Sequence, residues 1–101
     1  MPLILGASID FGTFATSTTT ASQVLPSACS VVTCMNLDGT NAIHIRFGTS
    51  GDAATTSDFR LSAGANHTFF FNQAGQHGYI HYISSASTPN LVVLVDNSAN
   101  A

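Results

Sequence analysis

Apolar and polar residues alternate in short runs along most of the chain, and no stretch keeps the 3.6-residue period of an amphipathic helix. In "AIHIRF", the apolar Ile43, Ile45 and Phe47 alternate with His44 and Arg46, which is the two-residue period of a half-buried strand. Clusters of Gly, Asn, Ser, Thr and Pro separate such runs. The pattern predicts eight strands, over residues 8–16, 21–25, 30–37, 42–48, 58–62, 67–72, 78–84 and 90–96.

Eight short strands in 101 residues predict an all-β chain, with one antiparallel, jelly-roll-like β-sandwich domain over residues 1–101. The turns "NLDGTN" and "QAGQHG" predict hairpins between the third and fourth strands and between the sixth and seventh. Gly12 predicts a bulge or a close backbone approach within the first strand. The last strand, "NLVVLVD", is apolar at both parities, so we expect both of its faces to be covered.

The amino-acid composition restricts the classes of molecule that the chain is expected to bind. Only 7% of the residues are charged, and Lys, Glu and Trp are absent, whereas about a quarter of a typical soluble domain is charged. We therefore expect a large part of the surface to contact other molecules. Two arginines and a net charge of −3 do not make the basic stripe that nucleic acid requires. The run "LVVLV" is too short to span a membrane, and "MPLILGAS" lacks the basic region and apolar length of a signal peptide, so we expect a soluble chain.

Two cysteines, Cys29 and Cys34, lie five positions apart. On one strand, that odd separation would send the two side chains to opposite faces. The spacing therefore predicts two reduced, partly buried thiols rather than a disulfide. A CxxC motif is absent, so no redox or zinc site is expected from them.

His44 and Arg46 lie two positions apart and project from the same face of their predicted strand. They either point together toward a substrate or form the polar outer face of a half-buried strand. No motif places a nucleophile or a carboxylate beside them. The sequence favours the exposed polar face, with Arg46 paired to Asp58 or Asp52.

Candidate metal and catalytic residues are few. His77 and His81 have the spacing of a helical metal pair, but on a strand they lie about 13 Å apart, too far to share one ion. The chain has no Glu and no GxSxG motif, and its aspartates lie mostly in or beside turns. We expect no catalytic residue, no metal site and no cofactor, so the chain is predicted not to be an enzyme.

Two segments are candidates for a protein interface. In "FFF", alternation places Phe69 and Phe71 on one face of a strand and Phe70 on the other. Unless both faces of the strand are covered, one of them lies outside the core. The sequence does not decide whether that face carries Phe70 or the pair Phe69 and Phe71. The Thr-rich stretch 14–23 predicts an exposed edge element. The predicted interface residues are Phe69, Phe70, Phe71, Thr18, Thr19 and Thr20.

One long segment, "NLDGTNAIHIRFGTSGDAATTSDFRLSAGANHTFFF", has an ordered pattern of its own. A turn with Asn and Gly leads to a strand that ends in "IRFG", followed by a Thr/Ala-rich loop, an apolar–polar step, "AG" and a further strand. This pattern, over residues 30 to 72, resembles small structural proteins of tailed bacteriophages. The matching residues are Asn36, Gly39, Ile45, Arg46, Phe47, Gly48, the loop Ala53–Thr56, Leu61, Ala63 and Gly64.

The resemblance implies a β-sandwich that assembles on a virion in the host cytoplasm. The implied role is a head decoration (cement) protein or a tail or connector component, and the resemblance does not separate these positions. The implied partners are the major capsid protein or other virion proteins, together with further copies of the chain. Neither nucleic acid nor a membrane is an expected partner.

A second class of function stays open beside this one: a carbohydrate- or receptor-binding module of a phage tail or fibre. Tyr79, His81 and Tyr82, with nearby Asn residues, would form its sugar-stacking platform. Tyr79 and Tyr82 are expected on opposite faces of one strand, and the chain has no Trp. The residues therefore favour a structural protein, and a small hydrolase is a distant third.

Overall fold

The computed structural model describes residues 9–26, 29–73 and 76–96 of the 101-residue chain. Each of the eight predicted strands is confirmed, with ends that differ by no more than two residues. Within the described ranges there is no helix, and so none that is long and apolar enough to cross a membrane. The strands are β1 (Ile9–Ala15), β2 (Ala21–Val24), β3 (Val31–Asn36), β4 (Ile43–Gly48), β5 (Phe59–Leu61), β6 (Asn66–Phe70), β7 (Tyr79–Ser84) and β8 (Asn90–Asp96).

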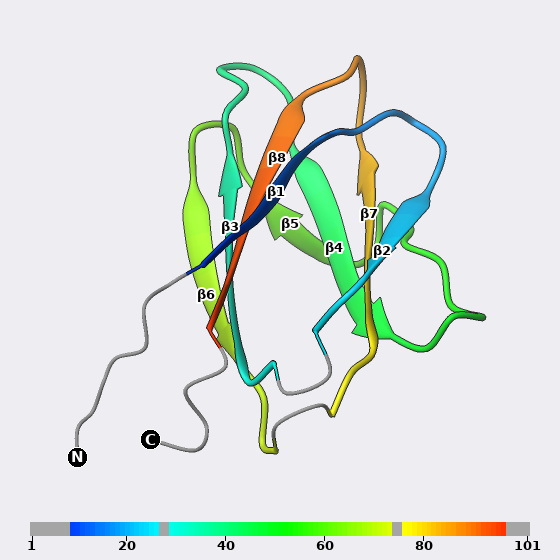
Figure 1. The fold of residues 1–101 in the computed structure, drawn as a ribbon. Helices are drawn as coiled ribbons and strands as arrows, with labels where there is room; N and C mark the ends of the chain where they lie inside the picture. The colour runs from blue at the N-terminus through cyan, green and yellow to red at the C-terminus, as the bar shows by residue number, and fades with distance from the viewer. Residues whose placement is uncertain (1–8, 27–28, 74–75, 97–101) are drawn as a thin grey trace.

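The strands form two four-stranded antiparallel sheets in the orders β1-β8-β3-β6 and β2-β7-β4-β5. The pairing is nested: β4 pairs with β5, β3 with β6, β2 with β7 and β1 with β8. The two sheets pack against each other as a sandwich (Figure 1). This order is that of a jelly roll built from two Greek keys, so the predicted jelly-roll-like sandwich is confirmed.

The two predicted hairpins are wrong. β3 and β4 belong to different sheets, and so do β6 and β7. The connection through Asp38 carries the chain from one sheet to the other, and its carboxylate accepts hydrogen bonds from the backbone N–H groups of Thr40 and Asn41. A polar turn sequence of this kind suits a crossing between sheets as well as a hairpin, so the turn residues alone do not decide which strands pair.

The core lies between the sheets, where alternate residues of each strand meet. Ile45 is buried and Phe47 packs partly buried against the same core, as alternation predicts. Tyr82 is the largest fully buried side chain, and its hydroxyl accepts a hydrogen bond from Gln23 Nε2 at 3.1 Å. The buried core residues are Leu25, Cys29, Val32, Cys34, Ile43, Ile45, Leu61, Ile80, Tyr82, Leu91, Val93 and Val95.

Gly12 interrupts the pairing of β1 with β8, as predicted. The register shifts between Asp10 and Gly12, which marks a bulge. A Cβ atom at this position would lie 2.7 Å from Cζ of the Phe14 ring. Because Phe14 packs against the core and stacks on Tyr82 at a centroid distance of 5.9 Å, a side chain at position 12 would displace a core aromatic ring.

Asn36, at the end of β3, joins the two sheets. Its side chain is only 2% exposed. Its Nδ2 donates hydrogen bonds to the carbonyl oxygens of Asn41 (2.8 Å), Leu61 (3.1 Å) and Ser62 (3.3 Å). Its Oδ1 accepts a hydrogen bond from the Asp38 backbone N–H at 2.9 Å. One buried amide thus holds both the β3–β4 connection and the residues that follow β5.

Both cysteine side chains are buried, more completely than the partly buried thiols that the sequence predicts. Opposite faces are expected only for two cysteines on one strand, and here both side chains belong to the core. Cys34 lies on β3, whereas Cys29 precedes that strand. Strand alternation therefore does not run between them.

The buried Cys34 thiol predicts a loss of stability at alkaline pH. Burial raises its pKa to about 12 from an ordinary value of 9.0, so the thiol ionises near pH 9 only in the unfolded chain. The stabilisation is fully present below that pH and is lost as the pH rises toward the folded-state pKa. Above pH 9 the free energy of unfolding, measured with urea, should fall by up to about 1.4 kcal/mol per pH unit from this group. Cys34→Ala should lack this component, and an identical pH dependence in both proteins would contradict the assignment.

Candidate interaction surfaces

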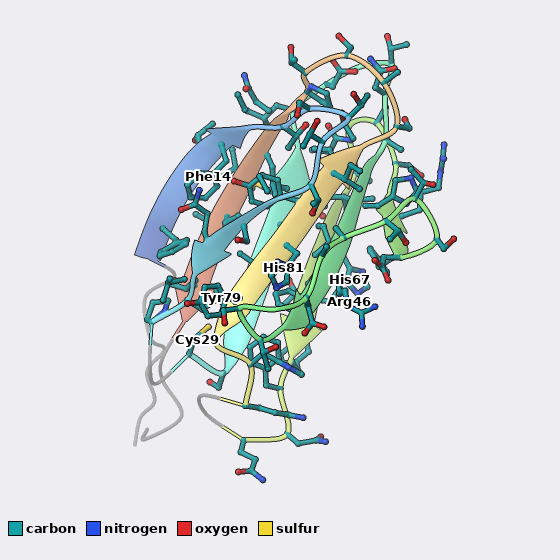
Figure 2. The ribbon with its side chains drawn as sticks, turned by 90° about the vertical axis from the view of Figure 1, so that its right-hand side faces the viewer. Phe14, Cys29, Arg46, His67, Tyr79 and His81 are labelled. Carbon is teal, nitrogen blue, oxygen red and sulfur yellow. The ribbon has the colours of Figure 1, made fainter. Side chains whose placement is uncertain are left out.

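The part of the outer face of the β2-β7-β4-β5 sheet that lies over β4 and β7 is covered by the chain itself. Residues 49–58, here the 49–58 loop, turn back over β4 and β7. His81 Nε2 donates a hydrogen bond to the Thr49 carbonyl at 2.8 Å, and His44 Nδ1 donates one to the Asp58 carbonyl at 3.1 Å. Figure 2 looks onto this side of the molecule, with His81 labelled on β7.

The prediction that His44 is exposed is therefore wrong. Its side chain does point to the outer face, as alternation requires, yet it is only 5% exposed. The loop is the physical reason: it covers the histidine and supplies a carbonyl acceptor for its ring nitrogen. Small residues permit the close approach, since Ala54 is buried and its N–H donates to Thr20 Oγ1 at 2.9 Å.

The 49–58 loop contains two turns of the same construction, "TSGD" and "TTSD". In the first, the Thr49 N–H donates to Asp52 Oδ2 at 2.8 Å and the Asp52 N–H donates to the Thr49 carbonyl at 3.1 Å. The second repeats this exchange between Thr55 and Asp58, at 2.8 and 3.0 Å. Each turn thus directs one aspartate oxygen to its own backbone and leaves the other available.

Arg46 links the two turns. Its guanidinium lies 3.3 Å from Asp58 Oδ1 and 3.8 Å from Asp52 Oδ1. The predicted pairing with Asp58 or Asp52 is confirmed, and the structure has both. Because the arginine is nearly half exposed, solvent screens both ion pairs and each contributes little to stability. The hydrogen bonds of the loop to the sheet therefore provide most of its attachment.

Asp52 has a lowered pKa, chiefly because the Thr49 N–H donates to its carboxylate, with a smaller contribution from the charge of Arg46. Gly48 makes room for this carboxylate, since a Cβ atom there would lie 2.9 Å from Asp52 Cγ. Arg46 and Gly48, two residues of the "IRFG" pattern, thus both hold the 49–58 loop on the sheet.

The proposed sugar platform is not assembled. Tyr79 lies on the outer face and stacks on His81 at a centroid distance of 6.0 Å, whereas Tyr82 points into the core, so the two tyrosines do lie on opposite faces. His81 and Tyr82 are both buried. Only Tyr79 of the three predicted residues is therefore accessible to a sugar ring.

The histidines are dispersed. His77 packs on the Phe71 ring at 4.9 Å, and His67 on Phe59 at 4.8 Å, both within a cluster of aromatic rings between β4, β5 and β6. Among residues 9–26, 29–73 and 76–96, no three His, Cys, Asp or Glu side chains gather closely enough to hold a metal ion, and no pocket is present.

The outer face of the β1-β8-β3-β6 sheet, here the bare face, differs from the covered one. Thr33 and Thr68 hydrogen-bond to each other on it at 2.9 Å, and apolar side chains surround them. No described loop is hydrogen-bonded across this face, so the expected cover over the outer side of β8 is not found among the described residues. Its central side chains are Val31, Thr33, Met35, Thr68, Phe70, Val92 and Leu94, none of them charged, whereas Asp10 and Asp96 pair in register with Leu94 and Val31 at its margins.

The structure settles which side of the "FFF" run faces out. Phe70 is 76% exposed on the bare face, whereas Phe69 and Phe71 pack partly buried against the core. The sequence prediction missed Val31, Met35, Val92 and Leu94 as surface residues. The sequence did contain the evidence for them, because "VVTCM" and "LVVLV" have apolar residues at both odd and even positions. Such a strand places apolar side chains on both of its faces.

The two predicted interface segments do not form one surface. Thr18, Thr19 and Thr20 are exposed in the β1–β2 connection, next to the end of β1, where Ala15 pairs with Asn90 at the start of β8. Phe70 lies at the other end of the sheet, in the row of Val31 and Asp96. The length of β8, about 20 Å, separates them.

Comparisons with protein-family models, with curated proteins and with solved structures found no match to this chain.

Proposed function

We propose that the chain is a non-enzymatic structural protein of a bacteriophage particle, a capsid decoration protein that binds the major capsid protein or other virion subunits. The observation that carries this proposal is the bare face. Its centre presents five apolar side chains and two threonines, whereas the 49–58 loop lies over β4 and β7 on the opposite outer face of the same sandwich. Phe70 is 76% exposed at the edge of the bare face, and contiguous apolar surface of this kind often marks an interaction site.

The size of the bare face favours a repeated contact. The whole outer face of the four strands, with about five residues along each, covers roughly 300 Å², and the seven central residues are part of it. A standard stable interface buries about 800 Å² on each partner. One such contact is therefore weak, and a capsid lattice that repeats it many times binds firmly through multivalency.

The reactive side chains already have structural tasks, which supports a role without catalysis. His44 and His81 each donate to a backbone carbonyl of the 49–58 loop, and Arg46 pairs with two aspartates. Burial raises the pKa of the Cys34 thiol to about 12, which suppresses the nucleophilic thiolate. The resemblance of residues 30–72 to tailed-phage structural proteins supports the same assignment.

The test is binding to particles assembled without this chain. Wild-type protein should bind in stoichiometric amount, and a chelator or moderate salt should not release it, because the contact rests on the apolar centre of the face rather than on charges that salt would screen. Leu94→Lys should reduce the bound copies at least about tenfold, since it places an ammonium group in a desolvated contact.

Val24→Lys is the matched control, because Val24 is 61% exposed on the other sheet, and it should bind like wild type. Far-UV circular dichroism should show that both variants are folded. Full binding by Leu94→Lys, or release of wild type by moderate salt alone, would contradict the proposal. Binding to a glycan at a tail tip, with no binding to the head, would favour the receptor-binding class instead.

A further inference from the structure

We propose that two copies of this chain pair through their β6 strands, antiparallel, about a two-fold axis that passes between the two Thr68 residues. This contact goes beyond the proposed function and does not depend on it, because it concerns the isolated protein. It arises from the free edge of the β1-β8-β3-β6 sheet, where β6 lies (Figure 1).

The four edge strands of the sandwich differ in how they discourage pairing. β1 carries a bulge, β5 has three residues and includes the exposed Arg60, and β2 has four residues and is followed closely by Pro26. Bulges, charges, shortness and proline are the devices that protect sheet edges. β6 has five residues in unbroken register with β3, and it contains neither proline nor a charged aspartate, glutamate, lysine or arginine.

The backbone of β6 presents its free hydrogen-bonding groups at alternate residues. The Ala65 carbonyl accepts from Asn36 N–H at 2.9 Å, and the Phe71 N–H donates to the Ser30 carbonyl at 2.9 Å, so odd-numbered residues face β3. In an antiparallel ladder the intervening residues direct both groups the other way. Asn66, Thr68 and Phe70 therefore point their N–H and C=O groups to the outer edge, where no described strand pairs with them.

A second β6 matches this edge in the required register. With Thr68 opposite the partner's Thr68, Asn66 faces the partner's Phe70, and these are the residues whose backbone groups point outward. The three pairs exchange six backbone hydrogen bonds. A shift by one residue would not align these groups.

The side chains of β6 are also complementary to themselves. On the bare face, Thr68 would lie opposite the partner's Thr68, and threonine–threonine pairs are favourable across antiparallel strands; within the subunit Thr68 hydrogen-bonds to Thr33 at 2.9 Å. On the inner side, His67 would meet the partner's Phe69, and these two ring types already pack within one subunit at 4.7 Å. Like charges directly opposite each other destabilise cross-strand pairs. The proposed pairing of two β6 strands contains no such pair of charges.

Pairing would also extend the surface proposed for binding. The two bare faces would join into one continuous eight-stranded face of roughly 600 Å², close to the area of a standard interface on one partner. Phe59, which is 41% exposed and packs on His67 at 4.8 Å, lies beside the same edge and would be covered.

Disulfide trapping tests the register. In a hydrogen-bonded antiparallel pair the Cα atoms lie about 5.5 Å apart, within disulfide range. Thr68→Cys should form a covalent dimer under mild oxidation, and mixed Asn66→Cys and Phe70→Cys should cross-link to each other. The native cysteines are buried and should not compete. Thr13→Cys, at an exposed site on β1, is the control and should stay monomeric.

A charge swap tests the symmetry. Thr68→Lys alone and Thr68→Asp alone each place like charges across the axis, and each should weaken dimerisation at least about tenfold in sedimentation experiments. An equimolar mixture should restore the dimer. If Thr68→Cys cross-links no faster than Thr13→Cys, or if the mixture associates no better than either variant alone, the β6 pairing is wrong. Circular dichroism should show that each compared variant is folded. If the position 68 variants do not fold, the same test is made with substitutions at Asn66 and Phe70.

Discussion

Replacing Asn36 with leucine should lower the free energy of unfolding by about 3–5 kcal/mol. The side chain is 2% exposed, and it donates to three carbonyls and accepts from one N–H. Leucine has a similar volume but satisfies none of these groups, so buried backbone atoms would lose their partners at about 1–3 kcal/mol each. Urea unfolding followed by circular dichroism measures the change.

Asn90→Leu is the matched control. Asn90 is exposed at the start of β8 and pairs with Ala15, so the same substitution should change stability by no more than about 0.5 kcal/mol. Similar losses at positions 36 and 90 would show that the buried amide is not what joins the two sheets. Hydrogen exchange provides a second measurement, because the Asp38 N–H should lose protection in Asn36→Leu alone.

Phe47→Ala should cost about 3–5 kcal/mol, as other large-to-small changes in a core do. The Phe47 ring packs edge to face on Phe69 and Phe71, at centroid distances of 4.9 and 5.1 Å. This one residue of β4 therefore packs against both β6 and the residue that follows it. Removing the ring would leave a cavity between the sheets and free both partners. The measurement is again the urea midpoint and slope.

Phe70→Ala removes the same ring from the same region and should cost far less, within about 0.5–1 kcal/mol, because Phe70 is 76% exposed. The pair of variants separates burial from aromatic content. If Phe70→Ala were as destabilising as Phe47→Ala, the inner and outer faces of β6 would be reversed from those described.

The position of His44 shows where prediction from local pattern ends. Alternation placed it on the outer face of β4, and it does lie there. Its burial depends on the Thr49 to Asp58 segment folding back, which in turn depends on two Thr–Asp turns, on Arg46 between them and on the contact of Ala54 with Thr20. The pairing of Arg46 with aspartate followed from charge alone, since few partners of opposite sign are present.

The amino-acid sequence by itself determined the eight strands, their two faces and the all-β class, because the alternation of side chains about an extended backbone is local. The chain's small, nearly uncharged surface residues likewise follow from composition. Only the tertiary structure decided that β3 pairs with β6 and β8 rather than with β4, and that the 49–58 loop lies over the outer face of β4 and β7. Nested strand pairing joins residues far apart in the chain, so its free energy depends on which faces become buried together, and no local pattern contains that information.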